Sequence, residues 1–274
     1  MKAYKGFDKN MHSNGYQFSE GETYVHDGPL SLCESGFHAC QDPIDCMAYY
    51  DPCDSVYHAV EADGVSDERG DDTKIVCKKI KIGARIGIAE MVKASIGFAF
   101  ASCKSAKNIG SSRMLASRQA ARGDFSRQSA SGHASRQAAE GYASRQSASG
   151  NESRQAASGY GSRQAASGDY SIQAASGNYN SQAVSGDGSR QAASGDGSRQ
   201  AASGHSSCQE TTGKNCVMMS AGNNGKARGK IGSWIVLTEW TDGVPDVVAM
   251  RIDGQKIKED TWYMAKDGKL VEAE

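Results

Sequence analysis

Cysteine and histidine side chains, the usual ligands of structural zinc, gather between residues 33 and 58 of this 274-residue chain. Structural zinc sites draw their ligands from cysteine pairs separated by about two to four residues. Here five or six residues separate successive cysteines, so the spacing favours buried free thiols. No metal or other cofactor is therefore expected. The residues are Cys33, Cys40, Cys46, Cys53, His38 and His58.

His38 is the residue of this segment whose chemistry suits a general base or a ligand contact, because imidazole exchanges protons near neutral pH. Asp42 and Asp45 follow closely and could orient it. No phosphate-binding loop or Ser/His/Asp order accompanies it, and a histidine after an aromatic residue in a turn is more often structural. We expect no catalytic residue; an enzymatic or ligand-binding N-terminal domain centred on His38 is the alternative.

Arginines recur at intervals of nine residues or a multiple of nine along the middle of the chain. Rows of guanidinium groups can bind phosphates, which makes nucleic-acid binding one interpretation. Asp124, Asp169, Asp187 and Asp196 bring the charge of the stretch close to balance. We therefore favour a charged ladder that prevents aggregation. The arginines are Arg118, Arg127, Arg136, Arg145, Arg154, Arg163, Arg190 and Arg199.

Aromatic residues punctuate the same stretch at Phe125, Tyr142, Tyr160, Tyr170 and Tyr179. Rings displayed on a rigid frame are efficient contact residues, because little conformational entropy is lost on binding. They are predicted to form a binding surface. The alternative is that they only cover the edges of a sheet.

A tandem nonapeptide, Ser-Arg-Gln-Ala-Ala-Ser-Gly-x-x, carries these arginines and rings. Glycine occupies every ninth position from 123 to 222, and glutamine every ninth position from 119 to 209. Such regularity favours an ordered repeat over a linker. Positions one, three and five carry no charge and alternate with positions that do. This alternation predicts a strand of about six residues that a Gly-x-x turn closes.

Two nonapeptides are expected to form each coil of a parallel β-solenoid, because nine residues are too few for one coil. Residues 18 apart then stack at about 4.8 Å, and Ser117 to Gly222 form about six coils. Glutamines should form amide ladders inside, serines should bond within the same stack, and arginines should face solvent. One row would hold Arg118, Arg136, Arg154 and Arg190, and the other Arg127, Arg145, Arg163 and Arg199.

The flanking segments are expected to cover the open ends of the solenoid. Ile88 to Lys107 is predicted to be a helix or an atypical first coil, and Trp234 to Trp240 a strand. Val247 to Ile252 and Gln255 to Ile257 are predicted to form a hairpin. The chain should be mainly β, with an N-terminal α+β domain over residues 1–110, the solenoid over 111–225 and a C-terminal β-hairpin cap over 226–274.

Composition and sequence patterning argue against a hydrocarbon core in the repeat, a membrane span and a secretory signal peptide. Between Ala116 and Gly213 only Phe125, Ile172 and Val184 belong to Leu, Ile, Val or Phe, so no hydrocarbon core is expected there. The sequence shows no run of about 18 apolar residues and no basic-then-apolar leader. Eight cysteines without a leader favour reduced thiols in a cytosol.

The N-terminal segment contains the motifs Leu32-Cys-Glu-Ser-Gly-Phe-His-Ala-Cys40 and Gly15-Tyr16-Gln17-Phe18. These motifs resemble a domain of an uncharacterised family of phage and prophage proteins. Asp253-Gly254, Asp260-Thr-Trp-Tyr263 and Asp267-Gly268 resemble the C-terminal segment that often accompanies this domain. The resemblance implies a phage-encoded protein in the cytoplasm of a host bacterium and carries no known activity.

We therefore expect a non-enzymatic binding protein that uses its solenoid to bind, and to inhibit, a host macromolecule in an anti-defence role. A host protein is the expected partner, and nucleic acid bound by the arginines is the alternative. The solenoid faces and the caps also offer surfaces for oligomer formation, and no membrane association is expected.

Overall fold

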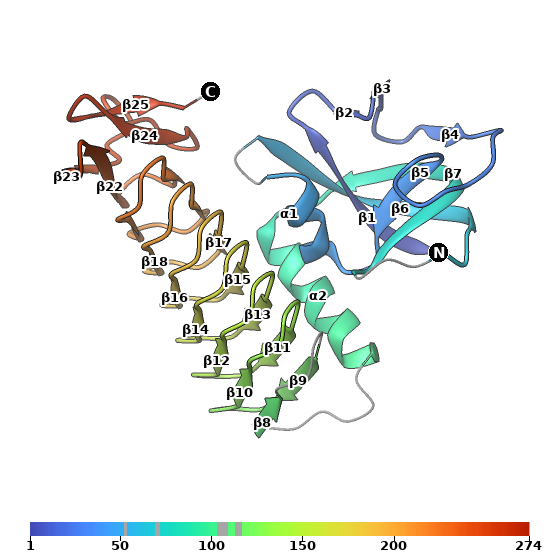
Figure 1. The fold of residues 1–274 in the computed structure, drawn as a ribbon, viewed down its shortest axis with the longest axis horizontal. Coiled ribbons are helices and arrows are strands. Elements are labelled where there is room, and N and C mark those ends of the chain that lie inside the picture. Colours follow the sequence, from blue (N-terminus) through green and yellow to red (C-terminus); the bar gives the residue numbers. More distant parts are fainter. Residues whose placement is uncertain (52–53, 69–71, 103–108, 113–116, 274) are drawn as a thin grey trace. The chain divides into compact units, whose positions relative to one another are not determined.

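The computed structural model describes residues 1–51, 54–68, 72–102, 109–112 and 117–273. The chain divides into two compact units, Met1–Phe98 and Ala99–Glu274, and each is described by itself. As expected, the protein is mainly β, with a parallel β-solenoid flanked by small β-rich regions (Figure 1).

The first unit is built on an antiparallel sheet with strand order β4-β7-β5-β1-β6. Because β6 also pairs with β7, four of these strands close into a small barrel. Its interior holds aromatic and branched side chains, among them Phe7, Phe18, Phe37, Ile75 and Ile80. The strands are β1 (Lys2–Asp8), β4 (Thr23–Val25), β5 (Phe37–Cys40), β6 (Ser55–Val65) and β7 (Lys74–Arg85).

Short elements and one longer helix complete this part of the chain. The strands β2 (His12–Ser13) and β3 (Tyr16–Gln17) form a small hairpin, and the 3-10 helix η1 (Pro43–Asp45) leads into α1 (Cys46–Tyr49). The helix α2 (Ile88–Ser102) buries Ile88, Met91, Val92, Ser95 and Ile96 at helical spacing. The helix predicted between Ile88 and Lys107 is confirmed as far as Ser102, and residues 103–107 lie outside the described residues.

The solenoid has two parallel sheets, and its strands alternate between them along the chain. Residues 18 apart pair in register, for example Gln137 with Gln155 and Gln128 with Gln146, so the coil of two nonapeptides is confirmed. The β9 sheet contains β9 (Arg118–Arg122), β11 (Arg136–Glu140), β13 (Arg154–Ser158), β15 (Ile172–Ser176), β17 (Arg190–Ala193), β19 (Cys208–Thr211) and β21 (Lys226–Arg228). The β10 sheet contains β8 (Ile109–Ser112), β10 (Arg127–Ala130), β12 (Arg145–Ala148), β14 (Arg163–Ala166), β16 (Ser181–Val184), β18 (Arg199–Ala202), β20 (Val217–Ser220) and β22 (Trp234–Thr241).

The C-terminal segment differs from the prediction. Parallel stacking continues past Gly222 to β22, which gives about seven turns over residues 118–237 instead of six. The predicted hairpin of Val247–Ile252 with Gln255–Ile257 is wrong, because the Asp253 carboxylate accepts the backbone N–H groups of residues 255, 256 and 257 and folds them into a turn. The hairpins present are β22 with β23 (Val244–Arg251) and β24 (Tyr263–Lys266) with β25 (Lys269–Glu272).

Glutamine fills the interior of the solenoid. The ten glutamines from Gln128 to Gln209 are at most 4% exposed. From Gln137 onward each Nε2 donates to the Oε1 of the glutamine 18 residues earlier, at 2.7–3.1 Å. Seven of them donate their second N–H to a backbone carbonyl of the facing sheet at 2.8–3.2 Å. The predicted amide ladders are confirmed.

The ladders end where apolar residues take the place of glutamine. Met218 and Ala227 occupy the next positions of the two columns, and they pack with Ile235 and Leu237 in a hydrocarbon core. The alanines at position five, such as Ala157 and Ala175, are fully buried and let the sheets approach closely. The solenoid therefore changes from amide to hydrocarbon packing toward its C-terminal end.

Serine at position one has a different partner from the one predicted. Its hydroxyl donates to the carbonyl of the glycine three residues earlier, as Ser153 does to Gly150 at 2.6 Å and Ser171 does to Gly168 at 2.7 Å. The serine thus closes its own turn rather than bonding along the stack, because that carbonyl is nearer. Ser117 differs, because its hydroxyl donates to the Ser135 hydroxyl in the next coil at 3.2 Å.

Glycine at position seven is required by the stacking of the coils. A Cβ built on these glycines would lie 1.8–2.5 Å from the backbone of the glycine one coil earlier. Position nine differs, because every residue there from Phe125 to Asn224 is left-handed, with φ between 52° and 69°, and most carry a side chain. The Gly column is therefore a steric constraint between coils.

Replacing one interior glutamine tests the ladder. Gln173→Met would leave the Oε1 of Gln155 and one N–H of Gln191 without partners, and it would remove the side-chain hydrogen bond to the Ala183 carbonyl, which also pairs within the β10 sheet. We expect a loss of about 3–5 kcal/mol in the free energy of unfolding, measured by urea denaturation, since each buried orphan costs about 1–3 kcal/mol. Ala165→Met, on an exposed outward position of β14, should stay within about 0.5 kcal/mol. Equal effects of the two changes would contradict the buried ladder.

Two glycine substitutions separate stacking from backbone strain. Gly195→Ala places a methyl group 1.8 Å from the Gly177 carbonyl oxygen, so we expect a loss above about 4 kcal/mol or failure to fold. Gly161→Ala meets no atom within 4 Å and should cost about 1–2 kcal/mol from its left-handed backbone alone. Thermal unfolding followed by circular dichroism measures both. A Gly195→Ala protein as stable as Gly161→Ala would show that the coils do not stack this closely.

Candidate functional site

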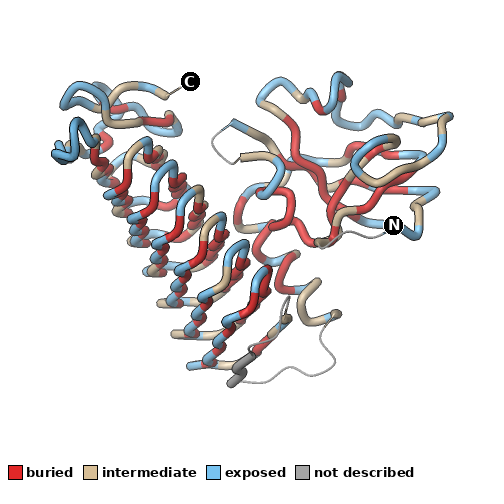
Figure 2. Tube along the Cα trace, in the orientation of Figure 1, coloured by how far each residue is buried: buried red, intermediate tan, exposed pale blue. Residues whose placement is uncertain are grey.

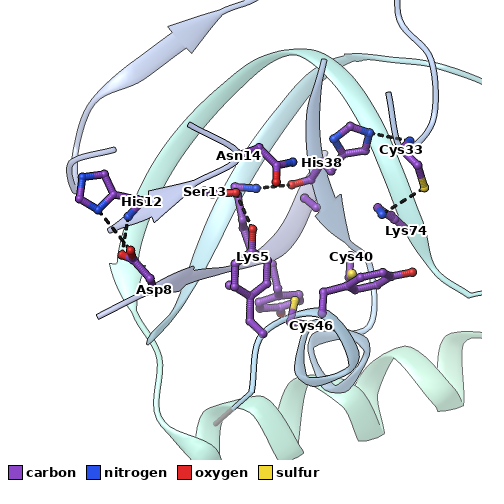
Figure 3. Close-up of a pocket in the computed structure, with 15 residues that line it drawn as sticks. Lys5, Asp8, His12, Ser13, Asn14, Cys33, His38, Cys40, Cys46 and Lys74 are labelled. Carbon is purple, nitrogen blue, oxygen red and sulfur yellow. Dashed lines mark hydrogen bonds and ion pairs between the residues drawn. The ribbon is translucent and has the colours of Figure 1, made fainter. Parts of the chain in front are cut away.

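A pocket of about 400 Å³ opens in the first unit, beside β1 and β5 (Figure 3). Charged and reactive side chains line it, which distinguishes it from an apolar cavity. Its walls come from β1, the hairpin β2–β3, β5, α1 and β7. The lining includes Lys5, Asp8, His12, Ser13, Asn14, Cys33, His38, Cys40, Cys46, Tyr49, Tyr50 and Lys74.

His38 lines this pocket, but backbone groups hold its ring. Its Nε2 accepts the backbone N–H of Cys33 at 2.9 Å. Burial lowers the pKa of His38, and the charges of Lys74 and Lys5 lower it further. His38 is therefore neutral at pH 7 and fixes the turn before β5.

The structure does not pair His38 with either carboxylate proposed to orient it. Asp42 is buried and caps η1 by accepting the backbone N–H of Ile44 at 3.2 Å. Asp45 is also buried and accepts the Thr73 hydroxyl at 2.6 Å and the Thr73 backbone N–H at 3.0 Å. These two carboxylates hold the segment between β5 and α1 against the start of β7.

Lys5 carries the most unusual environment of the pocket. Its side chain has the same parity along β1 as the core residues Ala3 and Phe7, and the residue is 5% exposed. Its Nζ donates to the His38 carbonyl at 3.0 Å and lies 5.4 Å and 5.6 Å from the ring centroids of Phe7 and Phe18. Burial lowers the pKa of Lys5 to about 8, since the charged form is poorly solvated there.

Thiols line the floor and rim of the pocket. Cys40 and Cys46 are buried free thiols, and their mutual hydrogen bond, with burial, raises the pKa of Cys40 well above its ordinary value. Cys33 is exposed, and the Lys74 Nζ lies 3.2 Å from its sulfur. Among the described residues no group of such side chains is arranged to hold a metal ion, and Cys53 lies outside them.

One cysteine departs from the expectation of free thiols. Cys33, Cys40, Cys46, Cys77 and Cys216 are free, whereas Cys208 is disulfide-bonded. The prediction of reduced thiols is therefore wrong for Cys208.

The solenoid presents a second candidate site, a strip of rings along the turns that lead from the β9 sheet into the β10 sheet. Phe125, Tyr142, Tyr160 and Tyr179 are 48–66% exposed. Neighbouring centroids lie 5.6, 5.6 and 5.1 Å apart, and Tyr142 and Tyr160 are parallel within 7°. Tyr170 lies on the opposite column of turns, where its ring covers Gly188. The structure thus joins four of the five predicted rings.

The arginines split between two different surfaces. Arg127, Arg145, Arg163 and Arg199 face solvent on the β10 sheet, as predicted. On the β9 sheet Arg118 is exposed and Arg190 half-buried. Arg136 and Arg154 are only 6% exposed, so the prediction that every arginine faces solvent is wrong.

The repeat sequence does not mark this difference between the sheets. Position four is alanine in the β9 sheet from Ala120 to Ala192, and in the β10 sheet it is Ser129, Ser147 and then alanine from Ala165 to Ala201. The strands β11, β13 and β15 nevertheless bury both inward and outward residues (Figure 2). The burial of Arg136 and Arg154 could therefore not be predicted from the repeat alone.

The turn carboxylates serve the backbone rather than the arginine rows. Asp169 accepts the backbone N–H of Asp187 at 2.9 Å, and Asp187 accepts that of His205 at 2.7 Å. Asp124 and Asp196 do the same for Tyr142 and Lys214. These side chains form a second ladder along the turns, which explains the Asp and Asn residues at position eight.

Comparison with known protein families finds a match for the N-terminal part of the chain. A domain of unknown function, DUF7666, covers residues 1–94, and this range contains every residue that lines the pocket. No curated protein and no solved structure matches the chain. Within the described residues, no helix has the length and apolar character that crossing a membrane demands.

The pH dependence of stability tests the burial of Lys5. The Lys5 ammonium has its ordinary pKa of 10.5 in the unfolded state and a pKa of about 8 in the folded state. Below pH 8 the buried charge therefore lowers the free energy of unfolding by its full amount. Lys5→Met removes that term. We expect the variant to gain relative to the wild type below pH 8 and this advantage to shrink by up to about 3 kcal/mol as the pH rises to 10.5. A stability difference that stays constant in urea denaturation across this window would contradict a buried ammonium.

Proposed function

We propose that this chain is a binding protein and that its solenoid presents a contact surface to a host macromolecule, most directly a host protein. The surface, named here the Tyr–Arg surface, consists of the rings of Phe125, Tyr142, Tyr160 and Tyr179 and the guanidinium groups of Arg127, Arg145 and Arg163. The ring strip carries the proposal, because four exposed rings in serial contact are held at fixed spacing.

The rings are suited to binding because folding has already ordered them. The Ser126 hydroxyl closes the turn of Phe125, and the Asp124 carboxylate in that turn accepts the backbone N–H of Tyr142 in the next coil. In the turn of Tyr179, the Asn180 side chain donates to the Gly177 carbonyl. Tyrosine and arginine dominate the energetics of protein interfaces, and pre-ordered side chains lose little entropy on binding. Aromatic rings that served only as edge covers would not need half of their surface in solvent.

The arginines border the strip along the chain. Arg127, Arg145 and Arg163 each follow a ring by two or three residues and begin the strands that leave those turns. The outward positions beside them on β10, β12 and β14 are serine or alanine, so this face is positively charged. A partner with an acidic surface fits it, and charge complementarity would speed the encounter.

The biological setting is part of the proposal. The resemblance of both ends of the chain to phage proteins supports a phage-encoded protein that acts in the host cytoplasm and blocks the partner it binds, as an anti-defence protein would. The geometry of the solenoid supports binding, and the resemblance supports the choice of host.

Binding of nucleic acid is the second candidate. The exposed arginines of β10, β12 and β14 repeat at the strand spacing of about 4.8 Å beside stacking rings, a combination that suits single-stranded nucleic acid. Binding of an oligonucleotide would then weaken steeply with salt. Replacing Arg127, Arg145 and Arg163 by serine would flatten that salt dependence, whereas a protein partner that depends on the rings would still bind the serine variant.

A pull-down from bacterial lysate with matched variants tests the proposed surface. Tyr142→Ala, Tyr160→Ala and Tyr179→Ala together should weaken capture of the partner at least about 100-fold, since buried interface rings each contribute about 2 kcal/mol. Tyr170→Ala, on the other column of turns, should leave capture unchanged. Recovery of no partner above background, or equal capture by the triple variant, would refute the proposal.

A further inference from the structure

The pocket of the first unit holds an ammonium group with donors to spare. An ammonium carries three N–H donors, and the Lys5 Nζ gives one of them to the His38 carbonyl at 3.0 Å. The rings of Phe7, Phe18 and Tyr50 lie 5.4–5.9 Å away, but rings supply no strong hydrogen-bond acceptor. Lysines that serve only as structure usually extend their ammonium to water, whereas Lys5 is 5% exposed and lines a cavity (Figure 3).

Among the residues that line the pocket, two lysines, Lys5 and Lys74, stand beside one carboxylate, Asp8. Lys74 on β7 lines the same pocket and lowers the pKa of both Lys5 and His38. The thiols nearby offer little compensation, because burial raises the pKa of Cys77 to about 11 and the contact with Cys46 raises that of Cys40. The titratable groups that face Lys5 are Cys40 and His38 on β5, Cys46, Tyr49 and Tyr50 at α1, Lys74 and Cys77 on β7, and Asp8 on β1.

The carboxylates at the pocket already have partners. Asp8 accepts the backbone N–H groups of Asn10 and His12 at 2.8 Å and 2.7 Å and pairs with the His12 ring at 3.2 Å. Asp72 accepts the Tyr49 hydroxyl at 2.5 Å and the Lys74 backbone N–H at 2.8 Å. Asp45 accepts two hydrogen bonds from Thr73. The described residues pair none of these carboxylates with Lys5, so its remaining donors are available to a ligand or to water in the pocket.

We propose that this pocket binds a small organic anion, with one carboxylate or phosphate group held by the Lys5 ammonium. Lys74, at the start of β7, adds a second positive charge to the lining. The hydroxyls of Ser13 and Tyr50, which contact each other at 2.5 Å, face the remainder of the ligand. The volume of about 400 Å³ lies toward the lower end of the range of ligand pockets, about 300–1,000 Å³, and favours a small molecule over a peptide.

Titration calorimetry of the full chain with inorganic phosphate and with benzoate tests this site and separates the two anion classes. We expect at least one of them to bind, Lys5→Met to weaken that binding at least about tenfold, and Lys74→Met to weaken it less. Lys2→Met is the matched control, because Lys2 lies on the same strand but does not line the pocket; it should bind like the wild type. Binding of neither anion more tightly than about 10 mM, or undiminished binding by Lys5→Met, would overturn the proposal.

Nitrogen-15 NMR of the lysine ammonium groups gives a second readout that does not depend on a variant that folds. The Lys5 signal should titrate near pH 8 in the free protein, and its midpoint should rise by about one unit or more when the anion is saturating. By linkage, the affinity should fall about tenfold per pH unit above the pKa of the free protein. An unchanged Lys5 midpoint at saturating anion would overturn the proposal even if the protein bound the anion elsewhere.

Discussion

Side-chain amide hydrogen bonds in the solenoid interior are the interaction on which the rest of this structure depends. A glutamine amide has two donors and can accept at its oxygen, and the two-sheet coil supplies partners above, below and across. Gln155, for example, donates to Gln137 and to the carbonyl of Ala165, and accepts from Gln173. Buried amides without such partners would cost free energy, so the ladder forms as a whole and demands the same residue in every coil. Glycine at position seven and alanine at position five follow from it, because the amides meet only when coils and sheets approach closely.

The rigid interior of the solenoid fixes the positions of the residues on its surface. Because the backbone repeats at fixed spacing, residues in the turns stand at fixed spacing as well, and a change of residue there alters the surface without disturbing the frame. Tyr142, Tyr160 and Tyr179 exploit this at positions eight and nine. The first unit works by a different principle, since its hydrocarbon barrel surrounds a polar pocket with a buried charge. The chain therefore presents two candidate recognition sites of different kinds, a broad surface on the solenoid and a small pocket in the domain of unknown function.

Periodicity made the solenoid predictable, and the lack of periodicity left the pocket unpredicted. The coil of 18 residues, the inward glutamines and the exposed turn rings follow from column chemistry that repeats many times. The burial of Arg136 and Arg154 was not predictable, because the Arg-Gln-Ala-Ala sequence of their strands also occurs in β14, where the arginine is exposed. In the first unit His38 was singled out for its chemistry, yet Lys5 is the residue with the perturbed environment. The sequence does place Lys5 on the same face of its strand as the core residues Ala3 and Phe7. The partners of a charged residue on such a face become known only once strands distant in the sequence have paired. The hairpin at Asp253 was misassigned because a carboxylate that closes a turn resembles the turn of a hairpin.

Hydrogen exchange of the glutamine side-chain amides, followed by NMR on the full chain, tests the central claim most directly. The account predicts that the Nε2 protons of Gln155, Gln164 and Gln173 exchange at least about 1,000-fold more slowly than those of the exposed Gln255. Exchange of these interior amides at the rate of Gln255 would show that the glutamines are bathed in water, and would contradict both the ladder and the rigid surface built on it.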